Sequence, residues 1–581
     1  MTIFAGAFCL GSTNGLPQGL RESLAAHLRN GSKSDGQRHV HDTQGMFLVK
    51  WDSGAFAEPA WRPSTTGSVS ALVGDPLFIE NGCRPVREQQ LQGLTPEANQ
   101  LGDLELAKCR GSFALVRYDE NNKTLHLATD AIGLRSVYYV VQDGVLIFAT
   151  ALRVLEAMPD VRKQLCLLGM SELSVLGFPL AERTPYEGIK VLRECQVLTA
   201  NERGVKLHNY YDWNITEPCA DSPAAAAAQI YKTFQDAVRM RAGNDKRVYS
   251  FLSGGMDSRA IVATLVGMGR QVEALNFSAE ASQDQLYGQL LAAEAGLNCR
   301  LHCLKGGNYP NFSFLALAAK TDLEHRESTS VDRPQFIWSG DGGSVGLGHV
   351  YMDEHMLDCG DRGDLQGAIK YFLEMNRIAL PSGILTTTAR KLLPNMLFDS
   401  VMAEVDRYPR EDIGRRIYLF LLFNDQRRHL FKHFETIDQH GLELLTPFYD
   451  SEFLKAIAAT PARWGILHRL YTQLFELLPA FARKTPWQTY PGHVPCPLPR
   501  DPRASYQWDS PAESHKQTFV ERGKQAIELV GSFSRSTQPK VFSESRIWLA
   551  GVAHALGLRD CRHLIQPLQT YKQYDAKTHR L

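Results

Sequence analysis

A regular alternation of strand and helix patterns between residues 247 and 304 constrains the fold of this chain more than any other feature. Apolar stretches rich in β-branched and aromatic residues alternate with helical patterns, in the order RVYSFL, SRAIVATLVGMG, VEALNF, QDQLYGQLLAAEAGL and RLHCL. Strands that are joined through helices pair in parallel with right-handed crossovers. The alternation therefore predicts a doubly wound parallel sheet with helices on both faces.

The first strand of this region runs directly into Ser-Gly-Gly and then into a helix. In an open parallel sheet, ligands bind beyond the carboxyl ends of the strands, where this loop would lie. A helix N-terminus offers unpaired N–H groups and the positive end of the helix dipole, so it favours an anion such as phosphate. Gly254 and Gly255 let the backbone approach the anion closely, and Ser253 and Ser258 add hydroxyl donors.

Asp257, in the same loop, would repel a bare phosphate. It makes chemical sense only with a cation between the carboxylate and the phosphate, most simply Mg²⁺. SGGMDS therefore predicts a pyrophosphate cradle with a metal ligand built in, and it lacks the lysine of the GxxxxGK[ST] loop. The alternative is an ordinary strand-to-helix turn capped by serine and aspartate; the full motif between a strand and an amphipathic helix makes it the weaker interpretation.

The rest of the chain divides by pattern into several units, because 581 residues exceed what one hydrophobic core holds. Residues 1–213 read as short strands with hairpin turns at Asp143-Gly144 and Arg203-Gly204, which predicts an α+β domain. Residues 214–224 form a polar linker, residues 225–500 contain the parallel sheet followed by helices, and residues 501–581 form a C-terminal extension. The extension is expected to begin with a loop or lid, RDPRASYQWDSPAESHKQ.

Composition narrows the partners and the compartment. The chain has 63 basic residues (lysine and arginine) and 63 acidic residues (aspartate and glutamate), so its formal net charge is zero. The net charge therefore gives no indication of a nucleic acid or an acidic membrane as a partner. No apolar run is long enough to span a bilayer, and the apolar MTIFAGAFCL reads as a buried strand. Eleven scattered cysteines without paired CxxC motifs favour reduced thiols in a cytoplasm, and strand packing explains Cys299 and Cys303 better than a metal.

FLSGGMDS resembles the pyrophosphate loop of N-type ATP pyrophosphatases, in the asparagine synthetase branch. Weaker matches follow the order of that family over residues 1–499: MTIFAGAF, GSFALVRYD with LATDAIGLRSVYYV, WSGDGGSVGLGH (Trp338–His349) and the segment Phe420–Asp450. The resemblance implies an N-terminal αββα amidotransferase-like (Ntn-type) sandwich. It also implies a C-terminal adenine nucleotide α-hydrolase-like sheet with added helices.

The chemistry implied by this resemblance uses ATP and Mg²⁺. ATP would bind with its adenine near Leu275 to Ser278 and with Gly340 in the second glycine-rich loop. A substrate carboxylate would attack the α-phosphorus, releasing pyrophosphate, and an amine or ammonia would then displace AMP to leave an amide. Lys484 aligns with the family lysine over the substrate carboxylate; its alternative is a solvated lysine beside Arg483.

Two departures from the family pattern bear on activity. Glutamine-using members expose a cysteine after removal of Met1, whereas residue 2 here is Thr2, the NGE-like position reads Asn81-Gly82-Cys83, and no HRGPD motif occurs. Threonine can serve as an N-terminal nucleophile, but the other glutamine-site residues are missing, and Cys9 has no free α-amine. The N-terminal half is therefore predicted to keep its fold without glutaminase activity, as in β-lactam synthetases and lasso-peptide macrolactam synthetases.

The second departure lies in the second loop. Family members usually read like SGEGSDE there, with an acid that helps to hold Mg²⁺, whereas this chain reads SGDGGSV, with Ser344 and Val345 at the acidic positions. Asp341 is a substitute metal ligand beside Asp257; the alternatives are a single well-held metal or weak adenylation. His429 and His433, on helical spacing, are predicted to be surface or packing residues.

The sequence thus predicts an ATP-dependent C–N ligase that forms AMP and pyrophosphate. One alternative is a degenerate relative that binds nucleotide or a partner without catalysis; another is a true glutamine-hydrolysing amidotransferase. Thiolation of tRNA or NAD synthesis would explain the loop but not the N-terminal half, and balanced charge argues against tRNA. The sequence does not decide whether the substrate carboxylate belongs to a small molecule, a peptide or a glycan. It also leaves open whether the amide forms within one molecule and whether the chain forms a homodimer.

Overall fold

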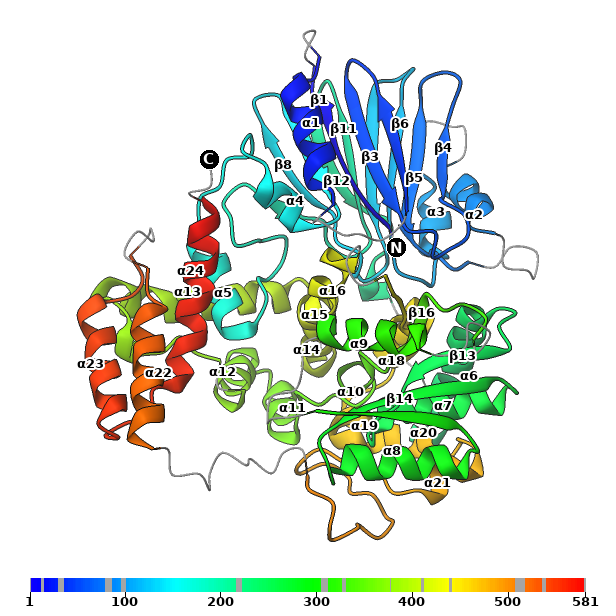
Figure 1. Cartoon of the computed structure of the whole chain (residues 1–581), viewed down its shortest axis with the longest axis vertical. Coiled ribbons are helices and arrows are strands. Elements are labelled where there is room, and N and C mark those ends of the chain that lie inside the picture. Colours follow the sequence, from blue (N-terminus) through cyan, green and yellow to red (C-terminus); the bar gives the residue numbers. More distant parts are fainter. Residues whose placement is uncertain are drawn as a thin grey trace.

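The computed structural model describes residues 2–11, 15–29, 36–78, 86–95, 101–215, 222–304, 312–325, 331–376, 378–408, 412–437, 441–506, 518–534 and 540–578. Figure 1 shows a pair of sheets at the top, formed by the N-terminal half, and a third sheet below them. The C-terminal helices lie at the left of this view, and the third sheet lies at the lower right. Among the described residues, no helix combines the length and the apolar character needed to cross a bilayer.

The N-terminal half contains two six-stranded antiparallel sheets. The first has the order β10 (Lys190–Val191), β8 (Tyr138–Gln142), β9 (Val145–Ala149), β1 (Thr2–Cys9), β3 (Met46–Asp52), β2 (Gln37–Asp42). The second has the order β12 (Gly204–Asn209), β11 (Gln196–Asn201), β7 (Thr124–Thr129), β6 (Phe113–Asp119), β5 (Val69–Gly74), β4 (Trp61–Pro63). The helices of this half are α1 (Gln18–His27), α2 (Arg87–Leu94), α3 (Asp103–Ala107), α4 (Leu152–Ala157) and α5 (Leu167–Leu176).

Alternate residues of these strands form a common core between the two sheets. Phe4 and Phe8 of β1 pack in one cluster with Val116 of β6 and Leu127 of β7, which belong to the second sheet. Every residue of β1 is buried, as expected for the predicted opening strand. The predicted Asp143-Gly144 turn joins β8 to β9, and both residues have the positive φ that a tight hairpin turn requires.

The predicted parallel sheet is confirmed. Its order is β15 (Asn298–Cys303), β14 (Gln271–Ser278), β13 (Arg247–Phe251), β16 (Phe336–Trp338), β17 (Glu443–Leu445), and all neighbouring strands pair in parallel. Helices α6 (Pro223–Ala242), α7 (Met256–Gly267), α8 (Gln283–Glu294) and α9 (Phe312–Glu324) belong to this region. The strand order reverses beside β13, so the loops after β13 and β16 open a crevice at a topological switch point.

Residues 343–484 are mainly helical, as predicted for most of this stretch. The helices are α10 (Gly343–Gly346), α11 (Glu354–Asp361), α12 (Leu365–Met375), α13 (Thr387–Asp406), α14 (Ile413–Phe420), a π-helical segment (Leu421–Gln426), α15 (Arg427–His429), α16 (Phe431–Glu435), α18 (Ser451–Ala458), α19 (Ala462–Gly465), α20 (Arg469–Phe475) and α21 (Ala480–Lys484). The C-terminal extension forms α22 (Phe519–Gly531), α23 (Glu544–Ala555) and α24 (Ile565–Thr578). Most of the predicted lid, residues 507–517, and most of the predicted linker, residues 216–221, lie outside the described residues.

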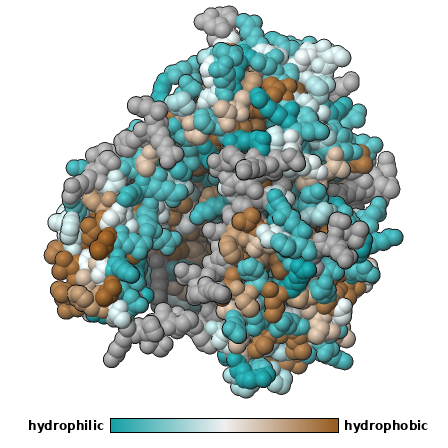
Figure 2. All heavy atoms as spheres, viewed as in Figure 1, coloured by the Kyte–Doolittle hydropathy of each residue, from teal (hydrophilic) through white to brown (hydrophobic). Residues whose placement is uncertain are grey.

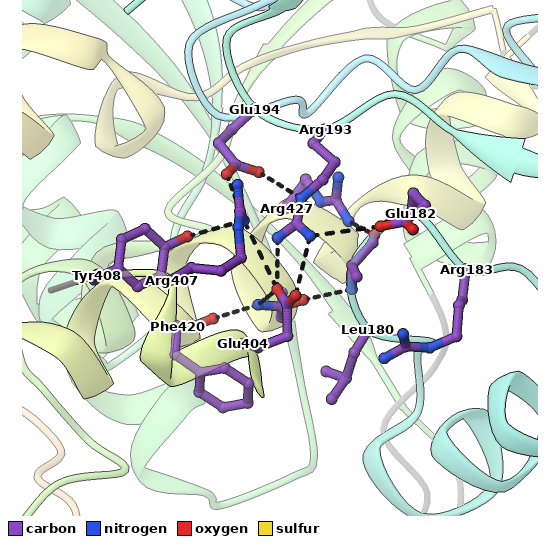
Figure 3. A network of polar contacts seen from close by, with 12 residues as sticks. Leu180, Glu182, Arg183, Arg193, Glu194, Glu404, Arg407, Tyr408, Phe420 and Arg427 are labelled. Carbon is purple, nitrogen blue, oxygen red and sulfur yellow. Dashed lines mark hydrogen bonds and ion pairs between the residues drawn. The ribbon is translucent and has the colours of Figure 1, made fainter. Parts of the chain in front are cut away.

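A buried network of charged side chains joins the N-terminal half to the helical region (Figure 3). Arg193, after β10, donates two hydrogen bonds to Glu404 of α13, at 3.0 and 2.5 Å. Arg407 donates to Glu194 at 2.9 Å, so two arginines and two glutamates alternate across the contact. Burial alone would lower the pKa of Arg193, but Glu194 and Glu404 raise it above its usual range. The two halves are therefore joined by ion pairs that are largely shielded from water, with Arg407 the most exposed partner at 31%.

Candidate functional site

A cavity of about 260 Å³ lies where the loop after β13 meets the start of α8 and the segment after α21. It opens at the switch point of the parallel sheet, the position predicted for the SGGMDS loop. The lining residues are Ser253, Gly255, Met256, Asp257, Asp284, Ser344, His468, Gln488, Thr489 and Tyr490. The volume is slightly below the range for small-molecule sites, roughly 300–1,000 Å³.

The predicted phosphate loop satisfies part of its own hydrogen-bonding capacity. The Ser253 amide donates to the Ser258 hydroxyl at 2.9 Å, and the Gly255 amide donates to the Ser253 hydroxyl at 3.2 Å. The Gly254 amide donates to an Asp284 carboxylate oxygen at 3.2 Å. No side chain caps the N-terminus of α7, which begins at Met256. The first-turn amides of α7 are thus the donors that an anion could reach without displacing a cap.

Three glycines let the phosphate loop pack closely against the start of α8 and against the second glycine-rich loop. A Cβ on Gly254 would lie 2.3 Å from the Gln283 carbonyl oxygen, and one on Gly340 would lie 2.7 Å from the Ser258 amide nitrogen. A Cβ on Gly343 would lie 2.5 Å from the Asp257 carboxyl group. The predicted glycine of the second loop, Gly340, therefore packs directly on the first turn of α7.

Asp257 is the most strongly held side chain of the cavity. One carboxylate oxygen accepts from the Ser344 amide at 3.0 Å and from the Ser344 hydroxyl at 2.7 Å. The other oxygen accepts from the Tyr471 hydroxyl at 2.8 Å. Burial raises the pKa of Asp257 to about 6, although these hydrogen bonds oppose the rise. Ser344, which replaces the family acid, thus donates to Asp257 instead of adding a second carboxylate.

The pKa of Asp257 predicts how cation binding should depend on pH. Only the ionised carboxylate attracts a cation, and below a pKa of about 6 the proton competes for it. If Asp257 holds a cation, the apparent affinity of the protein for Mg²⁺ measured without nucleotide is therefore expected to rise between pH 5 and about 7 and to level off above. Calorimetric titrations at several pH values measure this. A flat profile would show that Asp257 does not contact the ion.

Asp341, the other predicted metal ligand, is directed elsewhere. Its carboxylate accepts from His429 Nε2 at 3.0 Å and from the Ser339 hydroxyl, and it is not among the residues that line the cavity. Burial opposes ionisation, but the hydrogen bond and charge of His429 hold the pKa of Asp341 below its usual value. His429 was predicted to be a surface or packing residue; it is half exposed and paired with Asp341, whereas His433 is buried.

Lys484 lies at the end of α21 and is exposed, outside the cavity lining. The turn around Lys484 is anchored by Arg259 of α7, whose buried guanidinium donates to the carbonyl oxygens of Ala482, Thr485 and Pro486. Burial lowers the pKa of Arg259 to about 9. The chain then continues to Gln488, whose amide donates to the Gly254 carbonyl oxygen at 3.0 Å. Arg259 thus fixes the segment that closes the cavity.

The two residues predicted to surround the adenine are not part of this cavity. Leu275 lines a separate, open cleft beside β15 and α9, together with Arg300, His302 and Phe314. The hydroxyl of Ser278 is buried and donates to the Asn276 side chain.

Sequence reasoning missed several residues of the cavity. Asp284 stands in the first turn of α8, directly after the second parallel strand, and that position was a usable signal. His468 comes from the start of α20, and Nδ1 of His493 lies 2.9 Å from its Nδ1, so one of the two rings must be neutral. Burial and the neighbouring histidines lower the pKa of His468 to about 3. No local pattern marks His468 or residues 488–490.

The N-terminal glutamine site is described only in part. Thr2 is 1% exposed and Cys9 is 7% exposed, both within β1. The hydroxyl of Thr2 has no hydrogen-bond partner among the described residues. Asn81, Gly82 and Cys83 lie outside the residues that the structure describes. The nine described cysteines are free thiols, in line with the prediction of reduced cysteines.

Comparison with known proteins matches two families to consecutive parts of the chain. A glutamine amidotransferase domain matches residues 94–211, and asparagine synthase matches residues 229–310. The curated asparagine synthetase [glutamine-hydrolyzing] 3 of Bacillus subtilis (strain 168) is 33% identical over 162 residues, which are 27% of this chain and 26% of that protein. Amidase chry2 of Gibberella zeae is 28% identical over 171 residues, 29% of this chain and 25% of that protein. The matched segments span about a quarter of these relatives.

Among solved structures, glutamine phosphoribosylpyrophosphate amidotransferase from B. subtilis, complexed with ADP and GMP, is 11% identical with a TM-score of 0.24. The match covers 60% of this chain and 77% of that one. A TM-score this low adds nothing to the functional assignment.

Proposed function

We propose that this chain is an ATP-dependent C–N ligase. The premise is that it belongs to the asparagine synthetase-like family, because a glutamine amidotransferase domain match is followed by an asparagine synthase domain match. The reaction would adenylate a substrate carboxylate, release pyrophosphate and transfer the acyl group to an amine or ammonia. The proposal includes the finer fold assignment, an Ntn-type sandwich and an adenine nucleotide α-hydrolase-like sheet, with domains at residues 1–213 and 225–500. It also includes a cytoplasmic location.

The observation that carries the proposal is the cavity bounded by the SGGMDS loop. It combines the uncapped N-terminus of α7 with two carboxylates, those of the partly buried Asp257 and the buried Asp284, at the switch point of a parallel sheet. Two carboxylates alone would repel phosphate, so the arrangement suits phosphate only together with a divalent cation. The two carboxylates offer oxygen atoms, which are the ligands that Mg²⁺ prefers. ATP with Mg²⁺ is therefore the ligand that best explains the site.

Each residue then has a proposed role. Asp257 and Asp284 would hold Mg²⁺, with Asp341 able to act only after leaving His429. The pyrophosphate portion of ATP would be bound by the first-turn amides of α7 and by the loop residues Ser253, Gly254, Gly255 and Ser258. Mg²⁺ would supply stabilisation of the charge that develops on the phosphate oxygens. Leu275 and Ser278 remain proposed adenine contacts, and Gly340 keeps its place behind the phosphate loop.

Lys484 remains the proposed cation for the substrate carboxylate and phosphate, because it lies four residues before the cavity residue Gln488. Its exposed position makes this assignment directly testable with Lys484→Ala. Loss of AMP formation together with unchanged ATP binding would support it. Unchanged AMP formation would remove Lys484 from the site without affecting the role of Asp257.

A second candidate function is nucleotide binding without catalysis. One specific observation favours it: among the described residues that line the cavity, none is a lysine or an arginine. Charge that develops on the phosphate oxygens would then rest on the cation and the backbone amides alone. The hydrogen bonds from Ser344 to Asp257, where the family has an acid, point in the same direction.

The experiment that separates these functions supplies the full chain with ATP, Mg²⁺ and a panel of small-molecule, peptide and glycan carboxylic acids, with and without amines. The ligase proposal expects AMP and pyrophosphate in equal amounts with at least one acid, and hydroxamate formation when hydroxylamine is the acceptor. ATP binding without AMP for every acid would favour the second candidate. ADP as the nucleotide product would contradict the adenylation mechanism.

Replacing Ser344 by aspartate is expected to strengthen metal binding. The substitution puts a second carboxylate beside Asp257, so the apparent Mg²⁺ affinity should rise about tenfold, a change of about 1.4 kcal/mol. Without Mg²⁺ the two adjacent acids should repel each other, and the melting temperature should fall. Titration of Mg²⁺ at fixed ATP measures the first effect. Ser344→Ala is the control, because it removes the hydroxyl without adding charge; equal Mg²⁺ affinity in both variants would contradict the metal role.

The N-terminal half is proposed to lack glutaminase activity. The buried Thr2 and the absence of a cysteine at position 2 support this proposal. We expect no release of glutamate from glutamine above the rate of a heat-inactivated sample. Robust turnover would instead favour a glutamine-hydrolysing amidotransferase.

A further inference from the structure

The outer face of the α22–α23 hairpin exposes a group of large apolar side chains. Ile527 is 75% exposed, Leu549 is 68% exposed and Leu558 is 77% exposed. Figure 2 shows brown atoms gathered at the left edge of the molecule, where Figure 1 places α22 and α23. We call this surface the hairpin face; its apolar members are Phe519, Val520, Ile527, Trp548, Leu549, Val552, Leu556 and Leu558, each more than half exposed.

The two helices present these side chains on one side of the hairpin. The helices run antiparallel, because Arg522 near the start of α22 donates to the Ala555 carbonyl oxygen at the end of α23. Their contact line includes Gly551, where a Cβ would lie 3.0 Å from Val530. Val520 and Ile527 on α22, and Trp548 and Val552 on α23, are rotated by a similar angle from this line. In an antiparallel pair such positions share one face.

The opposite side of the hairpin is already used. Leu529 and Ile547 are 1% exposed, and Arg546 donates to the Leu385 carbonyl oxygen at 2.7 Å. Helix α24 connects the hairpin to the N-terminal half through a hydrogen bond of 3.1 Å between Tyr571 and Ser171 of α5. The hairpin is thus fixed to the body of the protein, and its apolar outer face is not a consequence of loose packing.

We propose that the hairpin face is the interface of a homodimer, with a second copy of this chain as its occupant. Each apolar side chain exposes on the order of 100 Å². Together they expose roughly 800 Å², the area that each partner contributes to an interface of standard size, about 800 Å². A patch this large exceeds what monomeric proteins typically leave exposed, roughly 300–600 Å².

The charges around the face fit a two-fold pairing. Exposed Glu521 and Lys524 on α22, and exposed Arg559 and Asp560 after α23, provide two acidic and two basic groups on or beside the hairpin face; Asp560 also pairs with Arg562 of its own chain at 2.6 Å. In a two-fold interface the same patch meets itself, so each copy can offer bases to the acids of the other. A strongly acidic or strongly basic partner would not meet a surface of opposite charge here, because the hairpin face carries both signs. Two hairpins stacked through their apolar faces form a four-helix arrangement with a largely apolar centre, in which Lys524, between Val520 and Ile527 on α22, needs an acidic partner from the other copy.

The test is the mass of the full chain in solution, measured by light scattering and sedimentation between about 1 and 50 µM. Two chains of 65.0 kDa each are expected for the unmodified protein. The double variant Ile527→Glu/Leu549→Glu should run as one chain, with a dimer dissociation constant raised at least a hundredfold. Leu104→Glu is the matched control: Leu104 is 75% exposed on α3, far from the hairpin, and its variant should stay dimeric.

Other results would overturn the proposal. A monomeric unmodified chain at 50 µM would do so, and so would a dimer that survives both the double variant and Leu558→Glu. Binding of the monomer to lipid vesicles or to another protein through this face would assign it a different occupant. Leu558 lies after the end of α23, so Leu558→Glu tests the face even if the double variant does not fold; near-ultraviolet circular dichroism checks folding in each case.

Discussion

Asp257→Asn is expected to reduce AMP formation by at least a hundredfold and to remove the Mg²⁺-dependent part of ATP binding. The asparagine keeps the size of the side chain and its place beside Ser344 and Tyr471, but it cannot carry the negative charge that a divalent cation needs. Loss of one preorganised electrostatic contact at a reacting phosphate costs about 2.7–4 kcal/mol, which corresponds to a rate factor of about 10²–10³. Quantification of AMP and pyrophosphate measures the effect.

The matched control for this substitution is Asp143→Asn, at an exposed hairpin turn between β8 and β9 that is paired only with Arg162. The control should leave AMP formation and ATP binding unchanged. Asp257→Asn must also keep its melting temperature, because the neutral side chain avoids the burial of an ionised carboxylate. A well-folded Asp257→Asn variant with full AMP formation would show that the chemistry takes place elsewhere.

Glu404→Ala is expected to cause the largest loss of stability, about 3–5 kcal/mol. Glu404 is 5% exposed and accepts two hydrogen bonds from Arg193 and one from Asn424 at 3.2 Å. Removal of its carboxylate leaves a buried guanidinium with less compensation, and the nearest other acid is Glu194 at 3.5 Å. The network in Figure 3 joins the two halves, so the melting temperature of the whole chain should fall.

Thermal unfolding followed by circular dichroism and calorimetry measures this loss. Asp143→Asn, which breaks an exposed ion pair whose side chains are 74% and 68% accessible and keeps a residue that tolerates the positive φ of this turn, should change stability by less than about 1 kcal/mol. If Glu404→Ala unfolds like this control, the network does not hold the two halves together. Separate transitions for the two halves in the variant would show that it couples their unfolding.

The parts of this molecule that were predictable from sequence are those that depend on local pattern. The strands β13, β14 and β15 and the helices α7 and α8 follow from periodicity and from the glycines that end them. The position of the SGGMDS loop at the carboxyl edge follows from the general rule for parallel sheets. The opening strand and the Asp143-Gly144 turn follow from residue type alone.

The parts that were not predictable depend on contacts between distant segments. No pattern around Ser344 reveals that its hydroxyl donates to Asp257, 87 residues away. Asp341 lies in the right loop, but His429 draws its carboxylate away from the cavity. The resemblance to the family placed Lys484 over the substrate carboxylate, whereas the turn held by Arg259 brings residues 488–490 to the cavity and leaves Lys484 exposed. Tertiary packing decides which side chains of a matching segment face the site.

The central claim is that residues 253–258 bind the pyrophosphate portion of ATP together with a divalent cation, and calorimetric titration of the full chain with ATP tests it most directly. We expect binding with a dissociation constant below about 1 mM in the presence of Mg²⁺, competition by inorganic pyrophosphate, and no binding when EDTA removes the ion. Adenosine, which lacks phosphate, should bind at least a hundredfold more weakly. No heat with Mg²⁺-ATP, or equal binding of ATP and adenosine, would contradict the account.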